Sequence, residues 1–232
     1  HRQALERGHG RVPPRARGGC VAAACFSPSG TAVLTAAGCG ARLWDVATGC
    51  CTAAFEGHTG TVTAAEFSLD GSLVLTASED ATARLWDARS AACTRVLEGH
   101  GAPLFSAAFS ADGARLLTAS DDHSARLWDT AAGGCRQRLE DPWAALTAAA
   151  ISQDGALVLT GSEDGTAKLW QAEAGECAQF FQAHTAFITC VAFAPGAKMV
   201  LTASGDGWAR LWDVESGACL HALGGHRASV TS

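Results

Sequence analysis

Tryptophan recurs along this chain at a fixed interval of 42 residues, and this period constrains the fold more than any other feature. Four of the five tryptophans lie in the pentapeptide ARLWD and the remaining one lies in AKLWQ. Self-similarity at a period of about 20–50 residues is the signature of repeat architectures, in which each copy packs on its neighbours. The tryptophans are Trp44, Trp86, Trp128, Trp170 and Trp212. We therefore treat the chain as five complete copies of one unit.

Each unit contains four short apolar segments separated by turn sequences such as Asp70-Gly71 and Glu79-Asp80-Ala81. In the second unit the segments are residues 61–67, 73–78, 82–87 and 93–97. Short apolar runs between turns of this kind are typical of an antiparallel β-meander. The sequence therefore predicts an all-β fold built from four-stranded antiparallel sheets.

A single four-stranded sheet cannot bury both of its faces, whereas copies stacked around an axis can. The first segment of each unit is apolar at matching positions, as expected of an innermost strand. One column of matching positions holds Val62, Leu104, Leu146, Ile188 and Val230, and another holds Phe67, Phe109, Ile151 and Phe193. We expect these residues to form the core.

Two dipeptides mark the second and third units, a Gly-His before the first segment and a Trp-Asp at the end of the third. They are Gly57-His58 with Trp86-Asp87, and Gly99-His100 with Trp128-Asp129. The pattern resembles the signature of WD-repeat β-propellers over nearly the whole chain from about residue 19. The resemblance implies a propeller, commonly seven-bladed, that acts as a platform for protein complexes.

The boundaries of the units predict two regions, an Arg-rich irregular segment at 1–18 and a propeller at 19–232. Residues 4–9 resemble the end of a preceding outer strand, and residues 225–232 resemble the start of a further blade. We expect a fragment of a seven-bladed or larger ring, because an arc would leave two unpaired sheet edges. A different closure and one half of a double propeller are the alternatives. The expected blades lie at about 19–55, 60–97, 102–139, 144–181 and 186–223.

Each regular unit also brings together a histidine, a threonine, an aspartate and a tryptophan, a set that could suggest nucleophilic catalysis. An active site is needed once, however, whereas this set recurs at fixed spacing. The family resemblance implies a structural network, in which Asp holds His, His meets a strand hydroxyl, and that hydroxyl meets the Trp N–H. The neighbouring serines 78, 120, 162 and 204 are the alternative hydroxyls. The network residues are His58, Thr76, Asp80, Trp86, His100, Thr118, Asp122, Trp128, Thr160, Asp164, Trp170, His184, Thr202, Asp206 and Trp212.

Two units depart from this pattern. The fourth has Asp141-Pro142 in place of Gly-His and Gln171 after its tryptophan, so its network lacks the imidazole. The first has the short turn Gly38-Cys39-Gly40, without the aspartate. We expect these two blades to be the least rigid.

The ten cysteines and the charge exclude several classes of function. Five cysteines, 51, 93, 135, 177 and 219, occupy one repeated position, which we interpret as a small buried hydrophobe at the start of the outer strand. Equivalent positions lie too far apart for a shared metal, so we expect no metal and no cofactor. Ten unpaired thiols favour the cytoplasm, with the nucleus as the alternative. No apolar run is long enough for a membrane span.

The net charge of −6 argues against nucleic-acid binding, because the positive charge gathers in residues 1–18 and leaves an acidic body. The Arg or Lys two residues before each tryptophan repeats in every unit. We interpret it as a solvated or snorkelling strand residue.

The family resemblance implies that partners bind the narrow face, formed by residues after each Gly-His and by the turn before each network aspartate. The aromatic candidates are Phe105, Trp143 and Phe187, and the acidic candidates are Glu79, Asp121 and Glu163. Large apolar groups beside carboxylates suit a peptide segment that carries Lys or Arg. The alternative is that Phe105 and Phe187 pack between blades.

The most favoured function is therefore a non-catalytic scaffold or adaptor that binds other proteins and no small-molecule substrate. A substrate-recognition or regulatory propeller attached to a ubiquitin ligase, a signalling ATPase or a kinase is the alternative. A chromatin-associated or nucleic-acid-associated propeller is a further one. An enzyme would need a polar cluster that breaks the repeat, and the sequence offers neither metal-ligand spacing nor a phosphate-binding loop.

Overall fold

The computed structural model describes residues 20–182, 184–226 and 228–230. These residues form five four-stranded antiparallel sheets, each a meander in chain order. The all-β prediction and the four-stranded blades are thus confirmed. No helix in the described residues could span a membrane. The predicted segment at 1–18 lies outside the described residues, and so do residues 227, 231 and 232 of the expected further blade.

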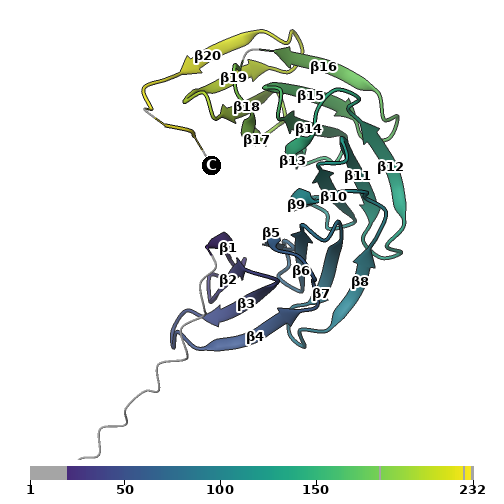
Figure 1. Ribbon diagram of the computed structural model, residues 1–232, viewed down its shortest axis with the longest axis vertical. Helices are drawn as coiled ribbons and strands as arrows, with labels where there is room; N and C mark the ends of the chain where they lie inside the picture. Colours follow the sequence, from purple (N-terminus) through teal and green to yellow (C-terminus); the bar gives the residue numbers. More distant parts are fainter. Residues whose placement is uncertain (1–19, 183, 227, 231–232) are drawn as a thin grey trace, which may run out of the picture.

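The five sheets are named blades 1 to 5, and their strands run from the centre outward in the order of the chain (Figure 1). In the second unit the expected and observed strands differ by one residue at most. The strands are β1 Val21–Phe26, β2 Ala32–Ala37, β3 Gly40–Asp45 and β4 Cys51–Glu56; β5 Val62–Phe67, β6 Leu73–Ser78, β7 Ala83–Asp87 and β8 Cys93–Leu97; β9 Leu104–Phe109, β10 Arg115–Ser120, β11 Ser124–Asp129 and β12 Cys135–Glu140; β13 Leu146–Ile151, β14 Leu157–Ser162, β15 Thr166–Gln171 and β16 Cys177–Gln182; β17 Ile188–Phe193, β18 Met199–Ser204, β19 Ala209–Asp213 and β20 Cys219–Leu223.

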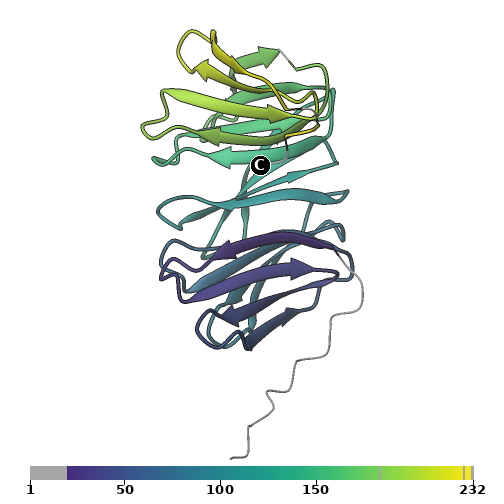
Figure 2. The same cartoon turned by 90° about the vertical axis from the view of Figure 1, so that its left-hand side faces the viewer.

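The blades form an open arc, with blade 1 at one end and blade 5 at the other (Figure 1). The innermost strands β1, β5, β9, β13 and β17 lie side by side along the inner rim, and the outer strands follow the circumference. Figure 2 shows the same blades edge-on, stacked one after another.

The hydrophobic core is divided into four clusters, each shared by two successive blades. Trp86 of blade 2 packs against blade 1, where its ring lies 5.8 Å from that of Phe55. Trp212 lies in the same way 5.3 Å from Phe181 of blade 4. The first expected core column is fully buried at 62, 104, 146 and 188, and the second is partly buried. Burial between blades explains why the tryptophans recur with the period of the repeat.

Hydroxyl groups near the start of the inner strands join neighbouring blades. Thr63 donates to the carbonyl of Leu104 at 2.7 Å, and Thr147 and Thr189 make the corresponding bonds to the next blade. Phe105 takes this position in blade 3, where the hydroxyl of Ser106 instead bonds to the backbone of Ala149. Phe105 therefore stands where three other blades have a threonine that bonds to the next blade. Packing of the blades alone does not explain a phenylalanine at this position.

The repeated cysteines begin the outer strands as expected, but the prediction that they are buried is wrong. All five are exposed. The outer strand is the edge strand of its sheet, so its first residue is accessible to solvent. Their thiols lie near the carbonyl two residues further on, as with Cys51 and Ala53 at 3.4 Å.

The turn between the second and third strands needs a left-handed residue, and blades 2 and 3 do not supply glycine there. Ala81 and His123 have φ of 66° and 65°, where blades 4 and 5 have Gly165 and Gly207. A side chain in this conformation costs about 1–2 kcal/mol. We therefore expect Ala81→Gly to raise the free energy of unfolding by about 1 kcal/mol in urea titrations.

The reverse change at Gly165 is the control. A Cβ there would lie 2.6 Å from the carbonyl oxygen of His184, so Gly165→Ala should be destabilising. Equal stability of Ala81→Gly and the unaltered protein would show that the turn is unstrained.

Candidate functional site

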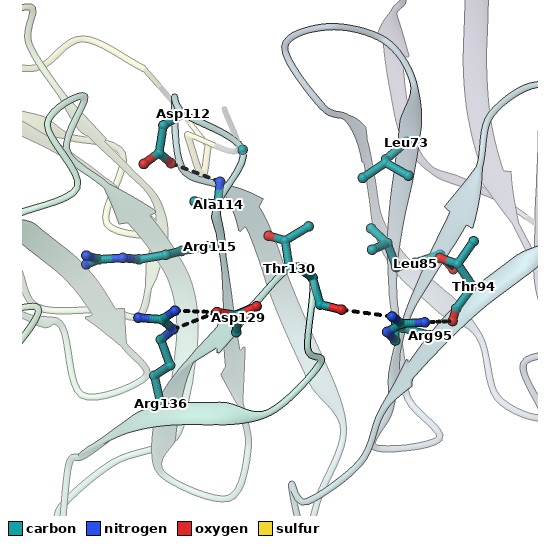
Figure 3. Close-up of a pocket in the computed structure, with 12 residues that line it drawn as sticks. Leu73, Leu85, Thr94, Arg95, Asp112, Ala114, Arg115, Asp129, Thr130 and Arg136 are labelled. Atoms are coloured by element: carbon teal, nitrogen blue, oxygen red, sulfur yellow. Dashed lines mark hydrogen bonds and ion pairs between the residues drawn. The ribbon is translucent and has the colours of Figure 1, made fainter.

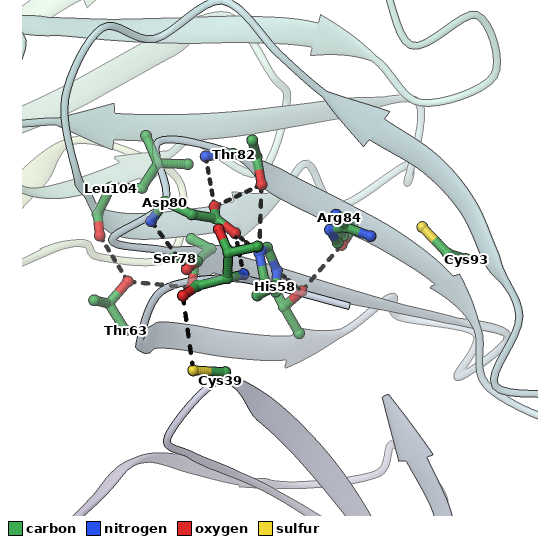
Figure 4. Close-up of polar contacts among 12 residues, drawn as sticks. Cys39, His58, Thr63, Ser78, Asp80, Thr82, Arg84, Cys93 and Leu104 are labelled. Carbon is green, nitrogen blue, oxygen red and sulfur yellow. Dashed lines mark hydrogen bonds and ion pairs between the residues drawn. The ribbon is translucent and has the colours of Figure 1, made fainter. Parts of the chain in front are cut away.

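The network of blade 2 joins Thr76 on β6 and Trp86 on β7 with His58 in the loop before β5 and Asp80 in the turn after β6 (Figure 4 shows its His58–Asp80 part). Nδ1 of His58 lies 2.9 Å from Oδ2 of Asp80, and its Nε2 lies 2.8 Å from Oγ1 of Thr76. The indole Nε1–H of Trp86 donates to the same threonine oxygen at 2.9 Å. The hydroxyl is thus the threonine, since Ser78 instead accepts the amide of Asp80.

Blades 3 and 5 repeat this geometry within 0.2 Å. The His–Asp distances are 2.9 and 3.0 Å at His100 and His184, and the His–Thr distances are 2.7 and 2.8 Å. Because the Trp N–H occupies one lone pair of the threonine oxygen, the hydroxyl proton is free to point at Nε2. The network therefore fits a neutral imidazole that donates from Nδ1 to the aspartate.

Burial lowers the pKa of His58, His100 and His184, although the hydrogen bond to aspartate opposes this shift in each case. The aspartates are held ionised. Burial alone would raise the pKa of Asp122, but donors from Ser124, Gly101 and His100 outweigh it and lower the pKa to about 2. Both imidazole nitrogens are thus engaged by the aspartate and the threonine, which supports the structural role that the family resemblance implies.

A further hydroxyl in the turn belongs to the network and was not predicted. Thr82 and Ser124 donate to Oδ1 of Asp80 and Asp122 at 2.7 and 2.6 Å, and Thr166 does so to Asp164 in blade 4. The signal was present in the sequence, because these residues share one column of the repeat. Trp208 occupies that column in blade 5 and is 41% exposed.

Of the predicted contacts among His, Thr, Asp and Trp, the two irregular blades keep only the Trp–Thr bond. Trp170 donates to Thr160 at 2.9 Å and Trp44 donates to Thr35 at 2.8 Å. In blade 4, Asp164 bonds to Ser162 and Thr166 within its own turn. The buried carboxylate of Asp141 instead forms an ion pair with Lys168 at 2.7 Å, a contact that the sequence did not suggest.

In blades 2 to 5 the basic residue two positions before the repeated tryptophan is partly buried, whereas Arg42 in blade 1 is exposed as expected of a solvated side chain. The guanidinium groups of Arg84 and Arg126 lie 5.9 Å from the rings of Trp86 and Trp128. A Cβ on Gly57 or Gly99 would lie within 2.7 Å of those groups, so glycine leaves the space that the arginine fills. The Gly of Gly-His is therefore explained by packing.

The aromatic and acidic candidates lie at one end of the blades, where each pre-strand loop bonds to a turn. The amide of Glu79 donates to Thr61, that of Asp121 to Pro103, and that of Glu163 to Ala145. We keep the term narrow face for the loops 57–63, 99–105, 141–147 and 185–189 with the turns 79–82, 121–124, 163–166 and 205–208. All six candidates are on this face and exposed: Phe105 at 37%, Trp143 at 80%, Phe187 at 46%, and Glu79, Asp121 and Glu163.

The alternative prediction, that Phe105 and Phe187 pack between blades, is only partly correct, because both side chains remain exposed. Phe187 packs over Gly205, where a Cβ would lie 2.8 Å from its ring, yet about half of its surface remains accessible. Gly205 stands where the other blades carry Glu79, Asp121 and Glu163. In blade 5, therefore, Gly205 replaces the acidic residue of the turn, and the ring of Phe187 packs over the glycine.

A family model for the WD domain, G-beta repeat, matches the chain at residues 49–87, 91–129, 133–171 and 175–213. The chain belongs to the WD40 family. Each matched WD40 segment runs from the outer strand of one blade to the third strand of the next, as in β8 with β9 to β11. WD40 repeats generally mediate protein–protein interaction and are typically non-catalytic. A search of curated proteins finds no match to the chain.

A groove of about 680 Å³ lies between blades 2 and 3, away from the narrow face of the WD40 fold (Figure 3). Leu73 and Leu85 line one side. Arg95 spans the two blades by donating to the carbonyl of Ala131 at 2.8 Å, and Arg136 pairs with Asp129. These charged groups are engaged with one another and with the backbone, so the groove is explained as part of the joint between blades. The described residues contain no group of three or more potential metal ligands.

One carboxyl group breaks the repeat inside the WD40 core. Glu66 on β5 stands where blades 3 to 5 have alanine and blade 1 has Cys25, and it accepts the backbone amide of Phe109 in blade 3. Burial raises the pKa of Glu66 to about 7 from its usual 4.5.

The free energy of unfolding should therefore depend on pH in two opposing ways. The folded chain binds fewer protons at its three network histidines than the unfolded chain, so stability should fall as pH falls below about 6.5. Glu66 binds more protons in the folded state between 4.5 and 7, so its contribution falls as pH rises through that window. We expect Glu66→Gln to steepen the loss of stability below pH 6.5 in urea titrations. An unchanged slope would show that Glu66 titrates normally.

Proposed function

We propose that the chain is a non-catalytic scaffold or adaptor that holds a segment of another protein on its narrow face. The supporting observation is that Phe105, Trp143 and Phe187 are exposed together with three carboxylates on this face. Exposed aromatic side chains are typical anchors of protein interfaces. None of these residues belongs to the repeated network, so the fold does not require them.

The charge of the face indicates the kind of partner segment. Glu79, Asp121 and Glu163 are exposed, and each lies in the turn before a network aspartate. Carboxylates attract a cationic segment, and aromatic rings add cation–π attraction of about 0.5–2 kcal/mol for each contact. We infer a basic peptide segment as the partner. We place the complex in the cytoplasm or nucleus, since the ten cysteines form no disulfide with one another and free thiols favour a reducing compartment.

The test is binding of a short fluorescent peptide of alternating arginine and glycine, followed by anisotropy at fixed salt. The variant Phe105→Ala/Trp143→Ala/Phe187→Ala should bind at least tenfold more weakly, because it removes the aromatic contacts and leaves the net charge unchanged. Val96→Ala and Leu220→Ala on the outer strands are the matched controls, since both side chains are exposed away from this face. Equal binding by the triple variant would exclude the narrow face as the binding surface.

A further inference from the structure

The loop at Asp141–Trp143 is the one place among the described residues of blades 2 to 5 where the Gly-His dipeptide and its arginine are both exchanged. Gly becomes Asp141, His becomes Pro142, and the arginine of the third strand becomes Lys168. In blade 3 the guanidinium of Arg126 lies 2.6 Å from where a Cβ on Gly99 would be. An aspartate therefore cannot coexist with that arginine placement, whereas the shorter lysine allows it.

The two exchanges complement each other in space. Asp141 is 1% exposed, and its Oδ1 lies 2.7 Å from Nζ of Lys168, whose side chain is 11% exposed. The lysine also lies 5.7 Å from the ring of Phe180 on the outer strand. A buried carboxylate is costly unless it is paired and hydrogen-bonded, so the lysine is needed once the aspartate is present.

The same carboxylate oxygen organises the loop that follows. The backbone amide of Trp143 donates to Oδ1 of Asp141 at 3.1 Å, which closes a turn of the Asx type. Pro142 between them fixes its own φ and reduces the freedom of the loop. The side chain of Trp143 is 80% exposed, the largest exposed fraction among the large hydrophobic residues that the structure describes.

Two acidic turns flank this loop. The amide of Asp141 donates to the carbonyl of His123 at 2.8 Å, which places the turn of Asp121 beside it in blade 3. On the other side, the amide of Glu163 donates to the carbonyl of Ala145 at 3.0 Å. Both carboxylates are exposed. An exposed aromatic ring between two carboxylates is suited to a single cationic side chain.

We propose that the buried Asp141–Lys168 pair positions Trp143, which with Asp121 and Glu163 forms a subsite for one arginine or lysine side chain of the partner. This rests on the proposed function, and it assigns the specificity of the narrow face to blade 4. Asp141 and Lys168 are positioning residues, because neither is exposed enough to contact the partner. Blade 4 then lacks the histidine network because Asp141 and Pro142 take the places of glycine and histidine in this loop.

The decisive variant restores the regular pattern of the other blades and keeps the tryptophan: Asp141→Gly, Pro142→His and Lys168→Arg together. Its fold should persist, since it offers the imidazole that Thr160 and Asp164 lack. We expect it to bind the arginine–glycine peptide about tenfold more weakly, close to the loss in Trp143→Ala. The amide of Trp143 should then donate to Asp164 instead of Asp141, as the amides of Thr59, Gly101 and Thr185 donate to the network aspartates of their own blades. With a peptide that carries glutamine in place of arginine, the unaltered protein and both variants should bind equally weakly.

Two outcomes would overturn the proposal. Restored repeats that bind the peptide as tightly as the unaltered protein would show that Asp141 and Lys168 do not position the loop. Full binding by Trp143→Ala would show that no subsite exists there; if Phe105→Ala and Phe187→Ala still weaken binding, the proposed function stands without it. Urea unfolding of each variant establishes that the folded state is the one measured.

Discussion

Thr76→Val is expected to lower the free energy of unfolding by about 2–6 kcal/mol. Valine keeps the shape of threonine but removes the oxygen that binds both Nε2 of His58 and Nε1–H of Trp86. Leaving a buried polar group without a partner costs about 1–3 kcal/mol, and here two groups are left. Urea titrations followed by tryptophan fluorescence measure the change.

Blade 4 supplies the matched control. Thr160→Val leaves only the N–H of Trp170 without a partner, because no imidazole is present there. The expected loss is about 1–3 kcal/mol, roughly half of that at Thr76. Equal losses at both positions would contradict the assignment of the histidine to the network. Repeat proteins can unfold blade by blade, so amide exchange within each blade should accompany the titration.

Lys168→Met is expected to cost about 3–5 kcal/mol, because it leaves the carboxylate of Asp141 buried without its cation. Methionine preserves most of the packing volume against Phe180, so the loss reports the charge. The measurement is again the free energy of unfolding in urea.

The double variant Asp141→Gly/Lys168→Met is the control for this effect. Removing both charges should recover most of the loss, since a buried ion pair is often no better than apolar packing. A loss in the double variant as large as in the single one would show that the lysine acts through packing alone and that the ion pair contributes nothing.

Features that repeat were predictable from the sequence, because one column of identical residues reports one shared environment. The strands and the inner core follow from such columns, whereas the order of contacts in the network was implied by the family resemblance. The turn hydroxyls Thr82, Ser124 and Thr166 belong to a column as well, and a search of every column for hydroxyls would have found them. The exposure of the repeated cysteines did not follow, since a column shows that positions are equivalent but not how deep they lie.

Features that break the repeat could be located in the sequence but not interpreted from it. Asp141 and Lys168 are two separate departures, and only the fold shows that the second compensates the first. Glu66 is a departure from the alanine of blades 3 to 5, and its acceptor role toward the amide of Phe109 depends on how blades 2 and 3 meet. His123 gives no local signal that its backbone is left-handed other than the glycines at the same position in blades 4 and 5.

We infer that the residues that repeat in the blades stabilise the fold, whereas the residues that break the repeat serve recognition. The repeated polar sets are buried and satisfied by one another, so they hold the blades in place and leave nothing for a partner. Phe105, Trp143 and Phe187 interrupt three different columns of the repeat, and all three are exposed on the narrow face. We infer that recognition depends on the departures, supported by the constancy of the rest.

Hydrogen exchange of the chain with and without the arginine–glycine peptide tests this division most directly. The account predicts protection on binding in the narrow-face loops, at residues 101–105, 141–147 and 185–189, and in the turns at 121–123 and 163–166. Turns at the opposite end of the blades, such as 68–72 and 110–114, should be unaffected. Protection confined to those opposite turns or to the outer strands would contradict the account.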